Sequence, residues 1–286
     1  MIEVRSQSYG KSQVRVSHIR RNGSVHEFIE LTCWVELMGD FDAAYTAADN
    51  SLVVPTDTMK NTVYVLAKKH GIDSLESFCR LLARHFIDSF SHVEVANVRG
   101  AESLWSRMEF GGEPHTHAFV APGNESNTCD VTAFADDLTQ TAGIAGLKVL
   151  KTTGSAFTNY LVDEQTTLQP TDDRIFATTI EANWPCSDPE ADWTTIRSRI
   201  REQLLAKFAK QHSESVQHTL YEMAGAALEA CPELSEISLT MPNQHHLLMN
   251  LAPFDLENPN EVFVPTDEPF GNISATIARS EAEASA

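Results

Sequence analysis

A long alternation of apolar and polar residues near the N-terminus constrains the fold more than any other feature. Val14 and Val16 alternate with polar residues, and after Asn22-Gly23 a longer run places apolar side chains on one face: Val25, Ile29, Leu31, Cys33, Val35 and Leu37. A period of two residues is that of a half-buried strand. Because Asn-Gly favours a type I′ turn, the pattern predicts a long β-hairpin with that turn.

Two helices are expected directly after this hairpin. The first covers about residues 58–69 and ends at Gly71, a common helix terminator. The second begins at Asp73, which forms a capping-box-like pair with Glu76. Shorter strand-like segments then follow near residues 92–99, 117–121 and 128–134.

The second half of the chain repeats this order of elements. Two strand-like runs, "GLKVLKTTGSAF" and "DRIFATTIEANW", precede a helix with Asp188 as candidate N-cap and a helix starting near Ser213 or Ser215. The strands "EISLTM" and "HHLLMNL" close the pattern. The repeated order predicts a duplicated α+β unit. The expected divisions are residues 1–136, residues 137–275 and a flexible tail, 276–286.

Composition narrows the class of protein. With 286 residues and 42% hydrophobic side chains, the chain can fill a sizeable core. Its net charge of −19, without a basic cluster, argues against nucleic acid or an anionic membrane surface as a partner. The sequence has no secretory signal and no apolar run of about 20 residues. Five scattered cysteines suit a reducing compartment, so a cytoplasmic location is expected.

Individual polar residues permit both ordinary and functional interpretations. Thr56-Asp57-Thr58 at a helix start is typical of N-caps, although free N–H groups there also bind anions. His115 and His117 lack a third metal ligand at suitable spacing, so no metal is assigned. Lys11 and Arg174 by default are surface charges, and only one of His245-His246 can face a site. These patterns alone indicate a soluble α+β enzyme or a binding protein.

A series of short segments, taken in order, carries a closer resemblance. These segments are "YGK", "TDTMKNTVYV", "LKVLKTTGSAF", "DEQTTLQPTDDR", "SVQHTLYEM" and "MPNQHH". Together they resemble the urate oxidase (uricase) family over roughly residues 7 to 275. The resemblance implies the tunnelling fold, in which each chain has two hairpin-plus-two-helix units. It also implies a homotetramer around a central tunnel, active sites shared between subunits, and no cofactor.

The resemblance assigns roles to individual residues. Those matching the family's proton relay are Lys11, Thr56 and His245. Those matching its substrate and oxygen site are Phe157, Arg174, Val216, Gln217 and Asn243, with Asp57 as a backbone contact beside the threonine. The chain departs from the common pattern at Pro55, Gln244 and Val162, none of which removes a functional group.

The implied reaction oxidises urate with dioxygen and water to 5-hydroxyisourate and hydrogen peroxide. In it, Arg174 and Gln217 would grip the purine, Phe157 would stack on it, and Asn243 would hold dioxygen. One alternative is another purine or pterin enzyme of the same fold, which would require a zinc site of Cys and His. A second alternative is a purine-binding tetramer without turnover, although a retained relay argues against it.

Overall fold

The long hairpin forms as its alternation requires. Strand β1 (Tyr9–Asn22) pairs antiparallel with β2 (Val25–Gly39), and Asn22 lies opposite Val25. The apolar face predicted for β2 is buried from Leu31 onward. The turn differs from the expected type I′, because Gly23 has a φ of 64° whereas Ser24 does not have a positive φ. A positive φ at the first turn residue alone is the type II′ pattern, which suits glycine.

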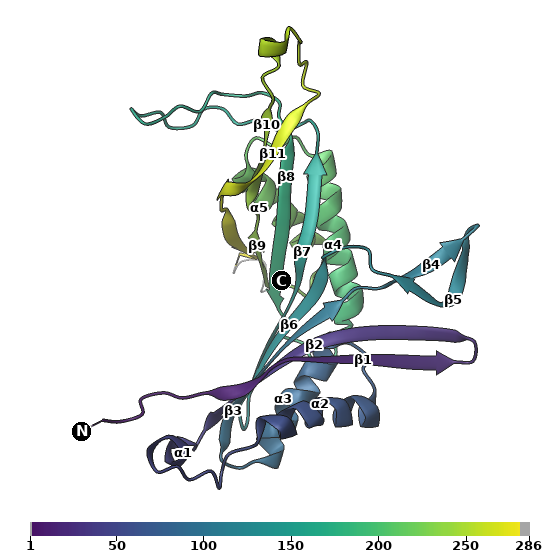
Figure 1. Cartoon of the computed structure of the whole chain (residues 1–286), viewed down its shortest axis with the longest axis vertical. Coiled ribbons are helices and arrows are strands. Elements are labelled where there is room, and N and C mark those ends of the chain that lie inside the picture. The colour runs from purple at the N-terminus through teal and green to yellow at the C-terminus, as the bar shows by residue number, and fades with distance from the viewer. Residues whose placement is uncertain (1, 281–286) are drawn as a thin grey trace. The chain divides into compact units, whose positions relative to one another are not determined.

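The protein is represented by a computed structural model that describes residues 2–280 (Figure 1). The chain divides into two compact units. Unit 1 comprises Met1–Ala145 and Pro185–Thr194, and unit 2 comprises Gly146–Trp184 and Thr195–Ala286. A segment of unit 1 therefore interrupts unit 2 in the sequence. The sequence predicted a single boundary near residue 136. Both contain helices and antiparallel strands, which confirms the α+β fold class.

Unit 1 is a sheet with helices on one face. The hairpin is followed by α1 (Asp42–Thr46), α2 (Thr56–His70), α3 (Leu75–Ser89), β3 (Val93–Ser103) and β6 (Ser126–Ala133). Its strand order is β1-β2-β3-β6-β7, where β7 (Leu138–Lys151) begins in unit 1 and ends in unit 2. Helix α2 contacts β1, and α3 contacts β3 and β6. The core lies between these helices and the buried face of the strands.

The helix starts in unit 1 differ from the predicted ones. Helix α3 is capped by Ser74, whose hydroxyl accepts from the Ser77 N–H in a capping box, rather than by Asp73 with Glu76. Helix α2 follows Pro55, and no side chain caps its first turn. The interpretation of Thr56-Asp57-Thr58 as helix caps is therefore wrong. The first-turn N–H groups of α2 are left without a capping side chain.

A small second hairpin lies beside the long one in unit 1. It consists of β4 (Ser106–Phe110) and β5 (Glu113–Val120). Phe28 of β2 contacts the Trp105 ring edge-on at a centroid distance of 5.7 Å. Arg107 also donates to the His26 carbonyl, which ties the small hairpin to the start of β2. The packing is thus aromatic and polar, outside the main core.

Unit 2 contains the second set of strands and helices. After β7 come β8 (Phe176–Pro185), α4 (Trp193–Lys210), α5 (Val216–Ala230), β9 (Glu236–Thr240), β10 (Asn243–Leu248), the short helix η1 (Ala252–Phe254), β11 (Phe263–Gly271) and β12 (Ser274–Ala278). Strand β8 pairs with β9 and β10, β10 pairs with β11, and β9 pairs with β12. The strands β11 and β12 were not predicted. Because β12 reaches Ala278, the expected tail overlaps a strand, and residues 281–286 lie outside the described part.

The two helices of unit 2 test the predicted caps. Ser215 caps α5, and its hydroxyl accepts from the His218 N–H at 3.1 Å, as expected. Asp188 does not cap α4, because that helix begins only at Trp193. The Asp188 carbonyl instead accepts from the Trp193 indole at 2.8 Å, so the segment before the helix is fixed by a side chain of its first residue. In the described chain, no helix is both long and apolar enough to cross a membrane.

All five cysteines are free and buried. Burial raises the pKa of Cys33 and of Cys186 to about 12, because a low-polarity environment disfavours the thiolate. We therefore expect no thiol of the native protein to react with a water-soluble aromatic disulfide at pH 8, and all five to react after unfolding in denaturant. Absorbance of the released thiolate counts the reactive groups. Rapid reaction of a native thiol would contradict the buried positions.

The raised thiol pKa values also predict the direction of a pH effect. An unfolded cysteine has a pKa of 9.0, whereas folded Cys33 ionises near 12. Between these values the unfolded chain has lost a proton that the native protein keeps, so the free energy of unfolding falls as pH rises from 9 to 12. Chemical denaturation at a series of pH values, with a Cys33→Ala variant as the control, measures this contribution.

Candidate active site

The predicted residues of unit 1 gather where β1 begins and α2 begins. The Tyr9 hydroxyl accepts from the Val54 N–H at 2.8 Å, two residues before Thr56. Tyr9 also lies two residues before Lys11, so one side chain ties both segments together. Gly10 is required between them, because a Cβ there would lie 1.9 Å from the Val35 carbonyl oxygen. The sequence pattern alone does not indicate this role of Tyr9.

Lys11 is held at an irregular point of the hairpin. It pairs with Val35, and the register then shifts before Val14. Gln13 has a φ of 55° within this shift, so the strand carries a bulge immediately after Lys11. Bulges redirect side chains and often lie beside functional sites. The half-buried Lys11 side chain therefore projects from the edge of a β-bulge and not from a regular stretch of strand.

The Asp57 carboxylate interacts electrostatically with lysines of both α2 and β1. Its pKa is lowered first by the hydrogen bond from Lys60, then by the Lys60 charge, the Asn61 hydrogen bond and, least, the Lys11 charge. Asn61 donates to the other carboxylate oxygen at 3.0 Å. Thr56 and Asp57 are both exposed. The start of α2 thus offers an exposed hydroxyl and uncapped N–H groups close to a lysine.

In unit 2, Arg174 and Phe157 form a pair. The Phe157 N–H donates to the Thr171 carbonyl at 2.8 Å, and the Arg174 N–H donates to the Ser155 carbonyl at 2.8 Å. This pairing places the Arg174 guanidinium carbon 5.3 Å from the centre of the Phe157 ring. Tyr160 also stacks on Phe157, with centroids 5.0 Å apart, a contact that the sequence did not indicate.

The Arg174 side chain is poorly satisfied by the protein itself. Burial lowers its pKa, because desolvation disfavours the charged form. Its Nε is buried and has no hydrogen-bond partner within residues 2–280. An unpaired buried donor is costly, about 1–3 kcal/mol. A ligand with an acceptor at that position would remove the cost.

Val216 and Gln217 are the first two residues of α5. Val216 is buried and Gln217 is exposed. The Val216 side chain therefore anchors the helix start in the core, and the Gln217 side chain is accessible to a ligand. The first turn carries no acidic residue. Its N–H groups and the helix dipole favour a negative charge at this position. The acidic net charge of the chain is thus compatible with a local anion site.

Asn243 and His245 lie on β10, with a register shift between them. Asn243 pairs with Gly271, and His245 pairs with Thr266. His246 faces opposite to His245 by strand alternation. A pocket of about 450 Å³ is lined by Arg174 and His246, together with Asp173 and Glu261, and not by His245. His246 Nδ1 is buried there without a partner in the described chain, a feature that sequence reasoning missed.

The structure thus divides the predicted residues between its units. Lys11, Thr56 and Asp57 belong to unit 1. Those in unit 2 are Phe157, Arg174, Val216, Gln217, Asn243 and His245. At the positions where the chain departs from the family pattern, Gln244 pairs with Ala177 of β8 and Val162 is 72% exposed.

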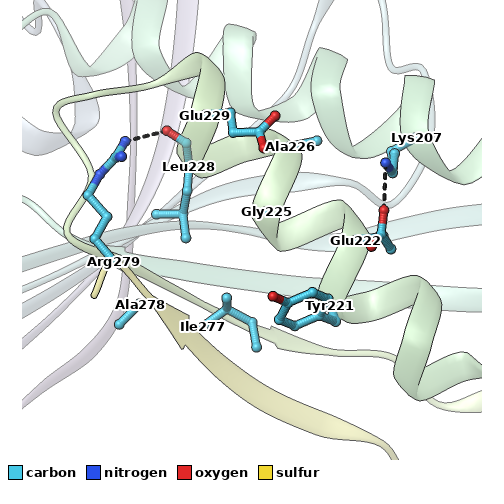
Figure 2. A pocket seen from close by; sticks show the side chains of 10 residues that line it. All are labelled: Lys207, Tyr221, Glu222, Gly225, Ala226, Leu228, Glu229, Ile277, Ala278 and Arg279. Atoms are coloured by element: carbon cyan, nitrogen blue, oxygen red, sulfur yellow. Dashed lines mark hydrogen bonds and ion pairs between the residues drawn. The ribbon is translucent and has the colours of Figure 1, made fainter. Parts of the chain in front are cut away.

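A separate pocket of about 320 Å³ is lined by residues of α5, by Lys207 of α4 and by the end of β12 (Figure 2). Lys207 and Glu222 form an ion pair of 2.7 Å there. Arg279 donates to carbonyls at the end of α5, including that of Cys231 at 3.3 Å. Lys207, Glu222 and Arg279 are thus engaged with the protein, and no predicted site residue lines this pocket.

His115 and His117, for which the sequence offered no third metal ligand, lie near a third histidine, His26. The His115 and His117 rings lie 4.6 Å apart, and His26 lies 5.8 Å from His117. Nevertheless, over residues 2–280 no group of three His, Cys, Asp or Glu side chains has an arrangement that could hold a metal ion.

Sequence comparison provides the decisive observation. The model of the family described as Uricase matches residues 7–132 and 140–274. The chain belongs to the uricase family. The Arthrobacter globiformis uricase is 42% identical over 271 residues, covering 95% of this chain and 88% of the relative. The Danio rerio uricase is 38% identical over 277 residues, covering 95% and 93%.

Solved uricase structures share the fold. A crystal structure of the uricase from Arthrobacter globiformis has a TM-score of 0.92 at 40% identity, covering 98% of this chain and 96% of that one. A uricase from Bacillus fastidious has a TM-score of 0.84 over 96% and 94%, at 23% identity, which speaks for the fold alone. The predicted family and its tunnelling fold are confirmed.

Proposed function

We propose that the protein oxidises urate with dioxygen and water to 5-hydroxyisourate and hydrogen peroxide, without a metal or organic cofactor. Membership of the uricase family supports this reaction class. The observation that carries the substrate assignment is the half-buried Arg174 side chain, whose buried Nε lacks a partner in the described chain. Urate is a planar anion with acceptors along its edge, so it suits such a donor.

The proposed clamp uses three features of unit 2. Arg174 contacts the carbonyl edge of urate, and the Gln217 side-chain amide supplies one donor and one acceptor. The first-turn N–H groups of Val216 and Gln217 favour the negative charge. Phe157 stacks on the purine, and ring stacking contributes about 0.5–1.5 kcal/mol.

The proposed relay moves the protons that urate must lose before it can reduce dioxygen. Lys11 draws a proton through the Thr56 hydroxyl, which both donates and accepts, and His245 forms the other end. Helix α2 contacts β1, the strand that carries Lys11, and this contact supports the first step. Asn243 holds dioxygen and later the attacking water over the purine ring.

We further propose that each site combines Thr56 and Asp57 of one subunit with Arg174, Gln217 and Asn243 of its neighbour in a homotetramer. The division of these residues between the two units is compatible with such sharing. Strand β1 also pairs on one side only, and edge strands favour addition of another strand. Urate and dioxygen are then the partners, and the cytoplasm is the proposed location.

Chelator-treated protein in metal-free buffer is expected to consume oxygen and release peroxide when urate is added, because every proposed site group is an amino acid side chain or an N–H. An oxygen electrode and a peroxidase-coupled dye measure the two quantities. Recovery of lost activity only on adding zinc, copper or iron would contradict the cofactor-free proposal. Absence of turnover in both treated and untreated protein would contradict the function itself.

A further inference from the structure

Three segments of unit 2 meet in one hydrogen-bonded junction that holds no proposed substrate contact. Asp173 lies at its centre, and its carboxylate accepts from the Thr153 hydroxyl at 2.8 Å and from the Gly154 N–H at 2.8 Å. The Gly154 carbonyl in turn accepts from the Ser213 N–H at 2.9 Å. A path of hydrogen bonds therefore runs from the residue before Arg174 to the segment before α5.

The junction continues into the first turn of α5. The Ala156 N–H donates to the Ser213 carbonyl at 2.7 Å. The Ser213 hydroxyl lies 2.6 Å from that of Thr219, which donates to the Ser215 carbonyl at 3.0 Å. Ser213 and Thr219 are both fully buried, so these contacts are shielded from water. The helix start is thus tied to the segment that leads to Phe157.

We propose that Asp173 is a positioning residue, which sets the distance between the Arg174–Phe157 pair and the start of α5. This inference rests on the proposed function of those groups as a urate clamp. Gly154 has a φ of 73°, which glycine adopts without strain. The Asp173 carboxylate fixes the Gly154 N–H from the residue adjacent to Arg174.

The charge of Asp173 agrees with a positioning role. A carboxylate beside an anion site repels an anionic ligand, so it weakens binding unless it contributes in another way, here by holding the site residues in place. The Thr153 hydrogen bond is the largest cause that lowers the Asp173 pKa. A lowered pKa means that the restraint is complete above pH 3.8 and is lost as pH falls through the folded value. At neutral pH the restraint is fully present.

The experiment compares Asp173→Ala and Thr153→Val with the wild type in steady-state urate oxidation. We expect KM to rise roughly tenfold or more in both, because charge-assisted hydrogen bonds are lost, with kcat changed less than about threefold. Thr153→Ser keeps the hydroxyl and should restore the wild-type KM. If Asp173→Ala does not fold, the two Thr153 variants decide the question.

Asp163 provides a matched control on the same loop. It accepts from a threonine hydroxyl and a backbone N–H, as Asp173 does, but both donors are its own neighbours, Thr166 and Gln165. Asp163→Ala should leave KM unchanged. An inactive wild type would overturn the proposed function. With an active wild type, an unchanged KM, a loss confined to kcat, or a fall in thermal midpoint alone in the Asp173 and Thr153 variants would overturn the positioning role.

Discussion

Replacing Lys11 with methionine is expected to lower kcat for urate oxidation roughly 10²–10⁴-fold, the usual loss when a positioned acid–base group is removed. Methionine keeps most of the side-chain volume but cannot take up a proton. Thr56→Ala should fall in the same range, because it removes the hydroxyl that passes the proton. Arg174→Ala should mainly raise KM, because it removes a binding contact. Oxygen uptake over a range of urate concentrations and pH values separates these effects.

Lys68→Met is the control for this experiment. Lys68 is an exposed lysine in the last turn of α2, so its replacement makes the same chemical change away from the corner of β1 and α2. Its kcat should equal that of the wild type. A Lys11→Met protein with near-normal kcat throughout the pH range would rule out the relay assignment.

Two impaired variants should restore activity to each other when they are expressed together and assayed at a urate concentration far below the KM of the Arg174→Ala protein, where neither variant alone turns over measurably. Thr56→Ala and Arg174→Ala chains each lack one half of a shared site. In a mixed tetramer, some sites receive Thr56 from one chain and Arg174 from the other. With equal expression and random assembly, on the order of a quarter of the sites are intact, because each contributing chain is the right one with even odds.

The measurement uses two different affinity tags, so that only tetramers containing both variants are recovered and assayed. The control is a mixture of the separately purified variants, which should stay inactive unless subunits exchange. Activity near a quarter of the wild-type value supports a shared site. Recovered mixed tetramers that are as inactive as their parents would show that both residues serve the same site within one chain.

The sequence predicted the elements whose signal is local. The hairpin of β1 and β2 has a sustained period of two, and Ser215 precedes a clear apolar stripe, so both were found. Strands β11 and β12 were missed because their residues are mostly exposed and lack alternation. The start of α4 was placed too early because the Asp188-Pro189 pair resembles a helix start, whereas the Trp193 indole donates to the Asp188 carbonyl and fixes that segment outside the helix. A local side-chain contact outweighed the capping preference.

The candidate site was predicted by resemblance and not by pattern. Taken alone, Lys11 and Arg174 look like surface cations, and their setting becomes evident only from the bulge at Gln13 and the contact with Phe157. The contacts of Tyr9, Asp173 and Ser213 were not predicted, for a different reason. Each acts through partners 40 or more residues distant or on a separate segment, and such pairings leave no periodic trace in a sequence.

The burial of the thiols affects how the protein would tolerate its own proposed product. Hydrogen peroxide attacks the thiolate form of cysteine. With a pKa of about 12, on the order of one Cys33 side chain in 10⁴ is ionised at pH 8. Met249 has no such protection, because a thioether needs no deprotonation and 37% of this residue is exposed. Oxidative ageing would therefore begin as a sulfoxide beside β10, at the surface, while the sulfur atoms of the core stay reduced.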